Sequence, residues 1–184
     1  MKKKIITTVK LYVAFTLVSV IAYSCCPEQT FQLQSFESLE IFQLATQDIQ
    51  DPVTTVTDEF TLLARFGENT FTTATIDFNF ITSAFATSCD NDTFLNRLNE
   101  ESLVVSLDKE FIYDGNTIPA NSNLIDITEI ANKTEVFYDL IQITFLNDFL
   151  EKSQFENQEY TFTLYVETTD GFEFEKQVSV TLNL

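Results

Sequence analysis

Residues 160–182 read YTFTLYVETTDGFEFEKQVSVTL, and this stretch decides the fold class. Apolar side chains occupy every second position in residues 160–166, and a similar alternation returns in residues 172–182. Period two is the spacing of side chains that share one face of a β-strand. Asp170-Gly171 between the two runs predicts a β-hairpin with a type I′ turn, in which both central residues have positive φ.

The same alternation recurs through the rest of the chain after the first 30 residues. It predicts a first strand in residues 31–44, interrupted near residues 35–38, and further strands at residues 60–66, 74–80, 103–107 and 141–145. The order of strands shows no alternation with long helices, so we expect antiparallel sheets.

Other segments carry turn or loop signals. Residues 48–58 contain Pro52 and many Thr and Asp residues and are expected to form a loop, and Asp114-Gly115 predicts a second tight turn. Residues 89–99 are polar, with room for a short helical turn. Residues 122–134 combine helical spacing with β-branched residues, so we expect a short helix or an irregular crossover there.

About seven strands separated by turns predict an all-β fold, specifically an antiparallel immunoglobulin-like β-sandwich preceded by a signal peptide. The chain has no Trp, the residue expected in the core of such a sandwich, but it has 19 Phe residues. We therefore expect phenylalanine to fill the interior.

The first 26 residues indicate export. Four lysines precede or flank a short apolar run in residues 11–22, which is shorter than the roughly 20 apolar residues that a bilayer span needs. A basic start, a short apolar centre and small residues at the exit are typical of a secretory signal peptide. We expect residues 1–24 to be the signal peptide, residues 25–30 a tether and residues 31–184 the β-sandwich domain.

The exit reads Ala22-Tyr23-Ser24-Cys25-Cys26 and resembles the bacterial lipobox, in which the cysteine thiol is acylated and becomes the new N-terminus. Tyr23 departs from the small residues preferred at that position. The resemblance implies lipidation of Cys25, with Cys26 as the alternative if cleavage falls one residue later. An ordinary secreted protein with two cysteines near its cleavage site is the remaining alternative.

Three cysteines allow one disulfide if Cys25 carries the lipid. Cys26 and Cys89 then remain, and an exported protein meets oxidising conditions in which a Cys26–Cys89 bridge can persist. Cleavage before Cys26 instead leaves Cys89 unpaired, and we then expect it to be buried.

The chain beyond the leader is strongly acidic. Four of the 10 basic residues and none of the 28 acidic residues lie in the first 24 positions, so the remainder carries six basic and 28 acidic residues, a net charge of −22. Such a surface repels nucleic acids and anionic lipid headgroups. We expect no nucleic-acid partner.

The sequence offers few catalytic groups. It contains no His, which removes the commonest general base and metal ligand, and its three glycines leave no phosphate-binding loop. Asp90-Asn91-Asp92 hints at a calcium loop but lacks the later ligand positions of an EF-hand, so we expect a solvated turn. We expect no enzyme activity, no cofactor and no metal site.

Several short features together resemble a family of small Bacteroidota lipoproteins of unknown function. These features are the lipobox with paired cysteines, Ser88-Cys89, Ile118-Pro119 and the closing Asp-Gly hairpin. The resemblance implies an immunoglobulin-like sandwich. The acidic export tag that usually follows the lipid cysteine is poorly matched, because Pro27-Glu28-Gln29 holds one acid. Display on the periplasmic side and display on the cell surface therefore remain as alternatives.

These observations predict a non-catalytic lipoprotein of the cell envelope, on the outer membrane, held by its N-terminal lipid. It either binds an envelope partner protein or has a structural role. One alternative is a carbohydrate-binding accessory lipoprotein, which requires at least two coplanar exposed tyrosines. The second is a carboxylate-dependent hydrolase, which requires a cleft with two acids, one of them with a raised pKa.

Overall fold

We describe a computed structural model of the chain, which covers residues 10, 12–13, 15–16, 28–44, 52–73 and 93–184. The chain divides into two compact units. The first contains Met1–Phe31 and Thr70–Leu95, and the second contains Gln32–Asn69 and Asn96–Leu184. Each unit is described by itself.

One sheet has five strands in the order β4-β1-β3-β9-β8. Its long strands are β1 (Glu28–Gln43) and β3 (Phe60–Thr73), and β9 (Leu140–Phe145) pairs antiparallel with β3. The short strand β8 (Thr134–Val136) pairs antiparallel with β9. At the other edge β4 (Thr93–Phe94) runs parallel to β1, with Phe31 opposite Phe94.

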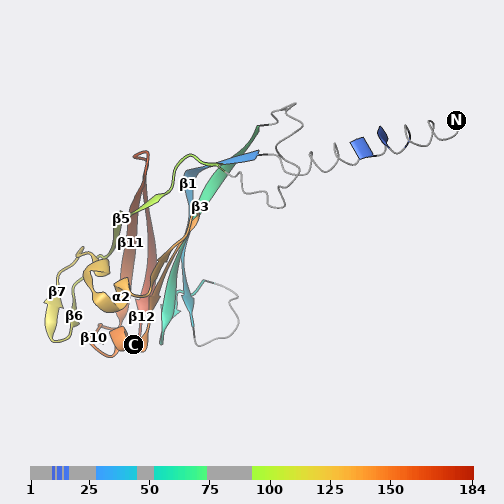
Figure 1. The fold of residues 1–184 in the computed structure, drawn as a ribbon. Helices are drawn as coiled ribbons and strands as arrows, with labels where there is room; N and C mark the ends of the chain where they lie inside the picture. The colour runs from blue at the N-terminus through green and yellow to red at the C-terminus, as the bar shows by residue number, and fades with distance from the viewer. Residues whose placement is uncertain (1–9, 11, 14, 17–27, 45–51, 74–92) are drawn as a thin grey trace, which may run out of the picture. The chain divides into compact units, whose positions relative to one another are not determined.

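The second sheet has four strands in the order β2-β12-β11-β5. β11 (Gln158–Thr168) and β12 (Glu173–Leu182) form a long antiparallel hairpin, visible in Figure 1. β5 (Leu98–Leu107) pairs antiparallel with β11, and the two-residue strand β2 (Thr55–Val56) runs parallel to β12.

A small third sheet and three short helical segments complete the second unit. The sheet has the order β10-β6-β7, formed by β10 (Ser153–Gln154), β6 (Phe111–Tyr113) and β7 (Asn116–Ile118). The helical segments are η1 (Leu124–Asp126), α2 (Thr128–Ala131) and α3 (Asn147–Leu150). Asn123 caps η1, because its side-chain oxygen accepts a hydrogen bond from the Ile125 N–H.

The interior of the second unit lies between the two large sheets and is rich in phenylalanine. Phe60 of β3 stacks on Phe145 of β9 with ring centroids 4.5 Å apart. Phe162 of β11 meets both rings edge-on, at 6.0 and 5.7 Å. All three side chains are at least 98% buried. The prediction that phenylalanine fills the core is therefore confirmed for this unit.

The predicted all-β class is confirmed. The strands expected around residues 60–66, 103–107 and 141–145 are β3, β5 and β9, while the strand expected at residues 74–80 lies outside the described residues. The short helix expected within residues 122–134 is present as η1 and α2. The described residues contain twelve strands, more than the expected seven, because several have only two or three residues.

Four expectations about the strands and helices need correction. No helical turn forms in the described residues 93–99, which hold β4 and the start of β5. The loop expected at residues 48–58 contains the short strand β2, and the pairs β1–β4 and β2–β12 are parallel. The first strand is continuous through residues 35–38, but its alternation is interrupted. Leu33, Leu39 and Ile41 are buried, whereas Ser35 and Glu37 are exposed.

The two Asp-Gly turns differ in type. Asp114 and Gly115 both have positive φ, at 48° and 76°, as a type I′ turn between β6 and β7 requires. In the β11–β12 hairpin Gly171 has a positive φ, at 87°, but Asp170 does not. The expected type I′ turn at Asp170-Gly171 is therefore wrong. The Gly171 N–H donates to Thr168 O, and the Thr168 N–H donates to Phe172 O. This is a three-residue loop closed by a left-handed glycine.

The described part of the N-terminal segment is helical at residues 10, 12–13 and 15–16. Among the described residues, no helix has both the length and the apolar character needed to cross a bilayer.

Asn96 connects the two large sheets from the start of β5. Its side-chain oxygen accepts from the Leu33 N–H at 2.8 Å, and its Nδ2 donates to Leu33 O at 3.1 Å. The amide therefore pairs with Leu33 of β1 as a neighbouring strand would. Nδ2 also lies 3.2 Å from Oδ1 of Asp170, in the β11–β12 loop. Asn96 is only 1% exposed, so no solvent replaces these bonds if the amide is lost.

Lys176 makes a second polar connection between the sheets. It lies on the inward-facing side of β12, and its ammonium group donates to the backbone carbonyls of Phe36 and Glu37 in β1. The same ammonium lies 5.6 Å from the centre of the Phe36 ring. Within the described part of the chain, β12 pairs with β2 at residues 181–182 alone, which leaves most of that edge of β12 unpaired there. An inward lysine is a known protection against edge-to-edge aggregation.

We predict that Asn96→Ala lowers the free energy of unfolding by about 2 kcal/mol or more, because it leaves the buried N–H and C=O of Leu33 without their partner. Asn69→Ala is the control, since Asn69 is exposed and donates only to the Gln34 side chain. Urea unfolding of the full chain measures both. Equal losses for the two variants would contradict the role assigned to Asn96.

Candidate functional site

The residues that the sequence singled out fall into two groups. Cys25, Cys26, Cys89 and the Asp90-Asn91-Asp92 segment lie outside the described residues. Asp170 and Gly171 lie in the loop that joins β11 to β12. There the Asp170 carboxylate accepts hydrogen bonds from Thr168 Oγ1 and from the Asn96 amide, so its visible role is to hold the loop against the start of β5.

The candidate site is the outer face of the β11–β12 hairpin near this loop. Strand register places Tyr165 opposite Glu175 and Glu167 opposite Glu173, and these four side chains point away from the interior because their neighbours Leu164, Val166 and Phe174 are buried. We call this group, Tyr165, Glu167, Glu173 and Glu175, the acidic face.

Hydrogen bonds hold the acidic face in place. The Tyr165 hydroxyl donates to Glu167 Oε1 at 2.7 Å. The register between β11 and β5 shifts between Tyr165 and Glu167, and there the Glu167 N–H donates to the Ser102 hydroxyl at 2.8 Å instead of to a strand carbonyl. Ser102 in turn donates to Asn99 O at 2.7 Å. The bulge is thus satisfied internally, and the Glu167 side chain keeps a defined position.

Electrostatics on the acidic face are dominated by carboxylates. The pKa of Tyr165 is raised to about 12, first because its hydroxyl is bonded to Glu167, then through burial and the negative charges of Glu167, Glu173 and Glu175. Directly opposed like charges such as Glu167 and Glu173 destabilise a sheet. Further along the same face, Thr163 is opposite Gln177 and Thr161 is opposite Ser179, and the hydroxyls of the latter pair lie 3.1 Å apart.

Several basic side chains of the second unit are engaged away from the acidic face. Lys176 points inward to β1, and Lys109 donates to Gln158 and to Glu159 O at the opposite end of β11. Lys152 pairs with Glu129 near the third sheet. The charges of Glu167, Glu173 and Glu175 are therefore left without compensation by these three lysines.

An exposed aromatic side chain directly precedes Glu173 in the sequence. Phe172 follows Gly171 in the hairpin loop and is 54% exposed. Its N–H donates to Thr168 Oγ1 at 3.0 Å, which fixes the backbone from which the ring projects. An aromatic anchor next to charged groups is a common composition of protein-binding surfaces.

A second feature is a hollow of about 380 Å³ lined by Glu37, Leu63, Arg65, Phe66, Asp139 and Leu140. Beside it the pKa of Glu68 is raised, first by burial and then by the charge of Asp139. A carboxylate hydrolase needs two acids facing one cleft. Two acids, Glu37 and Asp139, line this hollow, whereas Glu68, the acid with the raised pKa, is not among its lining residues.

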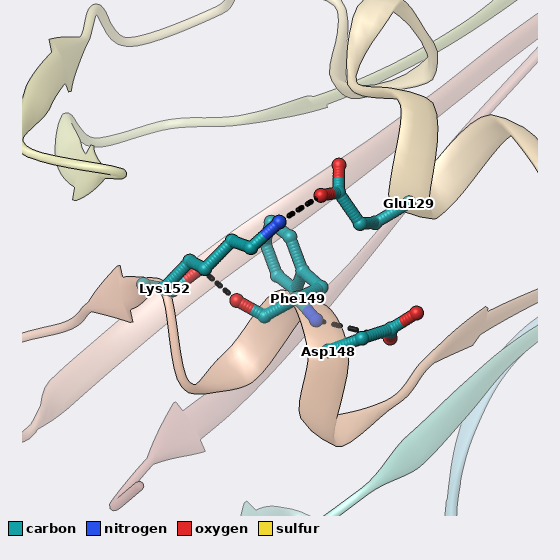
Figure 2. A network of polar contacts seen from close by, with 5 residues as sticks. Glu129, Asp148, Phe149 and Lys152 are labelled. Atoms are coloured by element: carbon teal, nitrogen blue, oxygen red, sulfur yellow. Dashed lines mark hydrogen bonds and ion pairs between the residues drawn. The ribbon is translucent and has the colours of Figure 1, made fainter.

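A polar network joins α2 to α3, as Figure 2 shows. Lys152 donates to Glu129, and the Ser153 hydroxyl donates to Phe149 O at 2.9 Å. Hydrogen bonds from Lys152 and Tyr113 lower the pKa of Glu129 to about 2. Burial, followed by the bond to Glu129, raises the pKa of Tyr113 to about 12. This network connects α2 with the chain at the end of α3.

None of the four tyrosines in the described residues 93–184 is mostly exposed, so these four do not form a sugar-stacking platform. Tyr160 is fully buried, and Tyr113, Tyr138 and Tyr165 are each partly buried. Burial and the charges of Glu68 and Asp139 raise the pKa of Tyr138 to about 12. Among the described residues, no group of three or more acids or cysteines is arranged to hold a metal ion, and this includes the glutamates of the acidic face.

The alternation in residues 160–166 implies that Tyr165 faces outward, but sequence reasoning did not identify the acidic face. Glu167 and Glu173 are six residues apart in the sequence, and only the length of the hairpin loop decides whether they are opposed. The positions of Glu167 and Glu173 relative to Gly171 in the sequence were the only signal for this pairing.

Comparison with known proteins adds no relative, because no protein-family model, no curated protein and no solved structure matches this chain.

We predict that Glu167→Gln lowers the pKa of Tyr165 from about 12 toward its ordinary value of 10, because the hydroxyl loses a charged acceptor. NMR of ring-labelled tyrosine resolves the individual titrations. Glu129→Gln is the control, and it should lower the pKa of Tyr113 and leave Tyr165 unchanged. Because the pKa is raised in the folded state, the associated stability is present below pH 10 and is lost as the pH rises toward 12. An unchanged Tyr165 titration in Glu167→Gln contradicts the assigned contact.

Proposed function

We propose that this chain is an exported, lipid-anchored protein of the cell envelope that binds a basic partner protein through its acidic face and has no catalytic role. The observation that carries the binding proposal is the directly opposed pair Glu167 and Glu173 beside the exposed Phe172. Such a pair costs stability, and departures from the rules of stable folding tend to occur at functional sites.

The charge of the acidic face selects the kind of partner. Nucleic acids and anionic lipids are repelled, whereas a protein surface rich in Lys or Arg is attracted and steered toward the face. Phe172 supplies the apolar contact that such an interface needs at its centre. The carboxylates are not grouped as metal ligands, which favours distributed cationic side chains over a single metal ion.

The anchor and the location rest on the sequence of the leader. Cys25 is the proposed site of acylation, with Cys26 as the alternative, and a Cys26–Cys89 disulfide is proposed to tie the tether to the domain. The proposed location is the outer membrane, on its periplasmic or its surface side. Two or more acyl chains hold a protein stably at a membrane, because each buried CH₂ contributes about 0.8 kcal/mol.

We also propose that the two large sheets form an immunoglobulin-like sandwich. The aromatic contacts between β3, β9 and β11 and the predominance of antiparallel pairs support this architecture. The parallel pairs β1–β4 and β2–β12 are at sheet edges and involve two residues each, so they are compatible with it.

The anchor is tested by growing cells that express the full chain with an alkyne fatty acid. We expect label on the wild type and none on Cys25→Ala, because only one thiol is acylated at a lipobox. Label that survives Cys25→Ala but is lost in Cys26→Ala moves the cleavage site by one residue. Label on neither the wild type nor any variant contradicts the lipid anchor.

The acidic face is tested by placing a photo-crosslinking benzoylphenylalanine at Tyr165 in the full chain in living cells. We expect a discrete adduct with one basic protein that weakens in Glu173→Gln/Glu175→Gln and at high salt, because the attraction is electrostatic. The control places the same group at Ile112, which is 36% exposed in β6. Failure to form an adduct at Tyr165, or equal adducts at both positions, contradicts the proposed binding face.

A further inference from the structure

Exposed apolar side chains of the first unit lie close to the proposed anchor. β1 begins at Glu28, so only Cys26 and Pro27 separate Cys25 from the first strand residue. An extended residue spans at most about 3.6 Å, so Phe31 lies within about 22 Å of Cys25 whatever path the chain takes between them. No long linker separates the anchor from this part of the sheet.

β1, the first strand after the proposed anchor, contacts apolar residues of the β4 segment. The Phe31 and Phe94 rings stack with centroids 5.3 Å apart, and the Leu95 N–H donates to Phe31 O at 2.9 Å. Phe94 is 37% exposed and Leu95 is 54% exposed. Phe71, near the end of β3 in the same unit, is 46% exposed. We call Phe31, Phe71, Phe94 and Leu95 the aromatic end.

We propose that the aromatic end inserts into the interfacial region of the bilayer that carries the lipid anchor. This inference rests on the proposed acylation of Cys25, because the short tether keeps these side chains at the membrane. Phe and Leu are typical of protein segments that enter the boundary between headgroups and acyl chains. Insertion removes their exposed apolar surface from water and adds a second contact that restricts how the protein turns about its anchor.

The charge of the chain determines which bilayer surface fits. With a net charge of −22 beyond the leader, the protein is repelled by anionic headgroups. The occupant of the aromatic end is therefore a zwitterionic bilayer surface, such as phosphatidylcholine or phosphatidylethanolamine.

The absence of Trp from the chain makes a direct test possible, since one introduced Trp is the only such fluorophore. Phe71→Trp and Phe94→Trp are purified as acylated protein and reconstituted in phosphatidylcholine vesicles whose acyl chains carry bromine, a contact quencher. We expect a blue-shifted emission and loss of about half of the intensity at both positions, because insertion reaches about 5–10 Å into the boundary. Vesicles containing anionic lipid should give less quenching.

Ile112→Trp is the matched control, because Ile112 of the second unit is as exposed as Phe94, at 36% against 37%. We expect no quenching there.

Vesicle flotation and the fatty-acid label separately report the anchor. Acylated protein that floats without quenching at Phe71 and Phe94, or with equal quenching at Ile112, overturns the inference alone. A blue shift without quenching indicates burial against protein, including a second copy, and also overturns it. A chain that is not acylated overturns the proposed anchor and, with it, the premise of this inference.

Discussion

Contact between three phenylalanine rings holds the second unit together. Phe60 and Phe145 are a cross-strand pair in one sheet, and Phe162 of the other sheet meets both edge-on. Because side chains alternate with period two, the pairing of Phe60 with Phe145 also places Leu62 opposite Ile143 and Ala64 opposite Ile141 on the buried face. A shift by one residue would turn this whole set toward solvent.

Apolar packing brings the sheets together, but two polar side chains define how they meet. Asn96 pairs with the backbone of Leu33, and Lys176 donates to the carbonyls of Phe36 and Glu37, all in β1. Leu33 precedes the part of β1 where the alternation of buried residues is interrupted, and Phe36 and Glu37 lie within it. A strand that is irregular there has backbone groups to satisfy, and these side chains satisfy some of them.

The longer strands could be predicted because the alternation of apolar and polar side chains is visible within each segment of the sequence. The hairpin turn could not be predicted fully, since Asp170 accepts a hydrogen bond from Asn96, 74 residues earlier in the chain. The short helix α3 and the strands β2 and β4 are too short to leave a periodic signal. The acidic face was missed for a related reason, because the opposition of Glu167 and Glu173 depends on the loop that separates them.

The two faces of the β11–β12 hairpin contribute to stability with opposite signs. Its inner face carries Phe162, Leu164 and Val180, whose burial stabilises the fold. Its outer face near the loop places Glu167 against Glu173, an arrangement that opposes folding by a fraction of a kcal/mol up to about 1 kcal/mol. The apolar inner face tolerates that cost. Ser102 and Tyr165 nevertheless hold Glu167 in place, and this agrees with the binding role proposed for the acidic face.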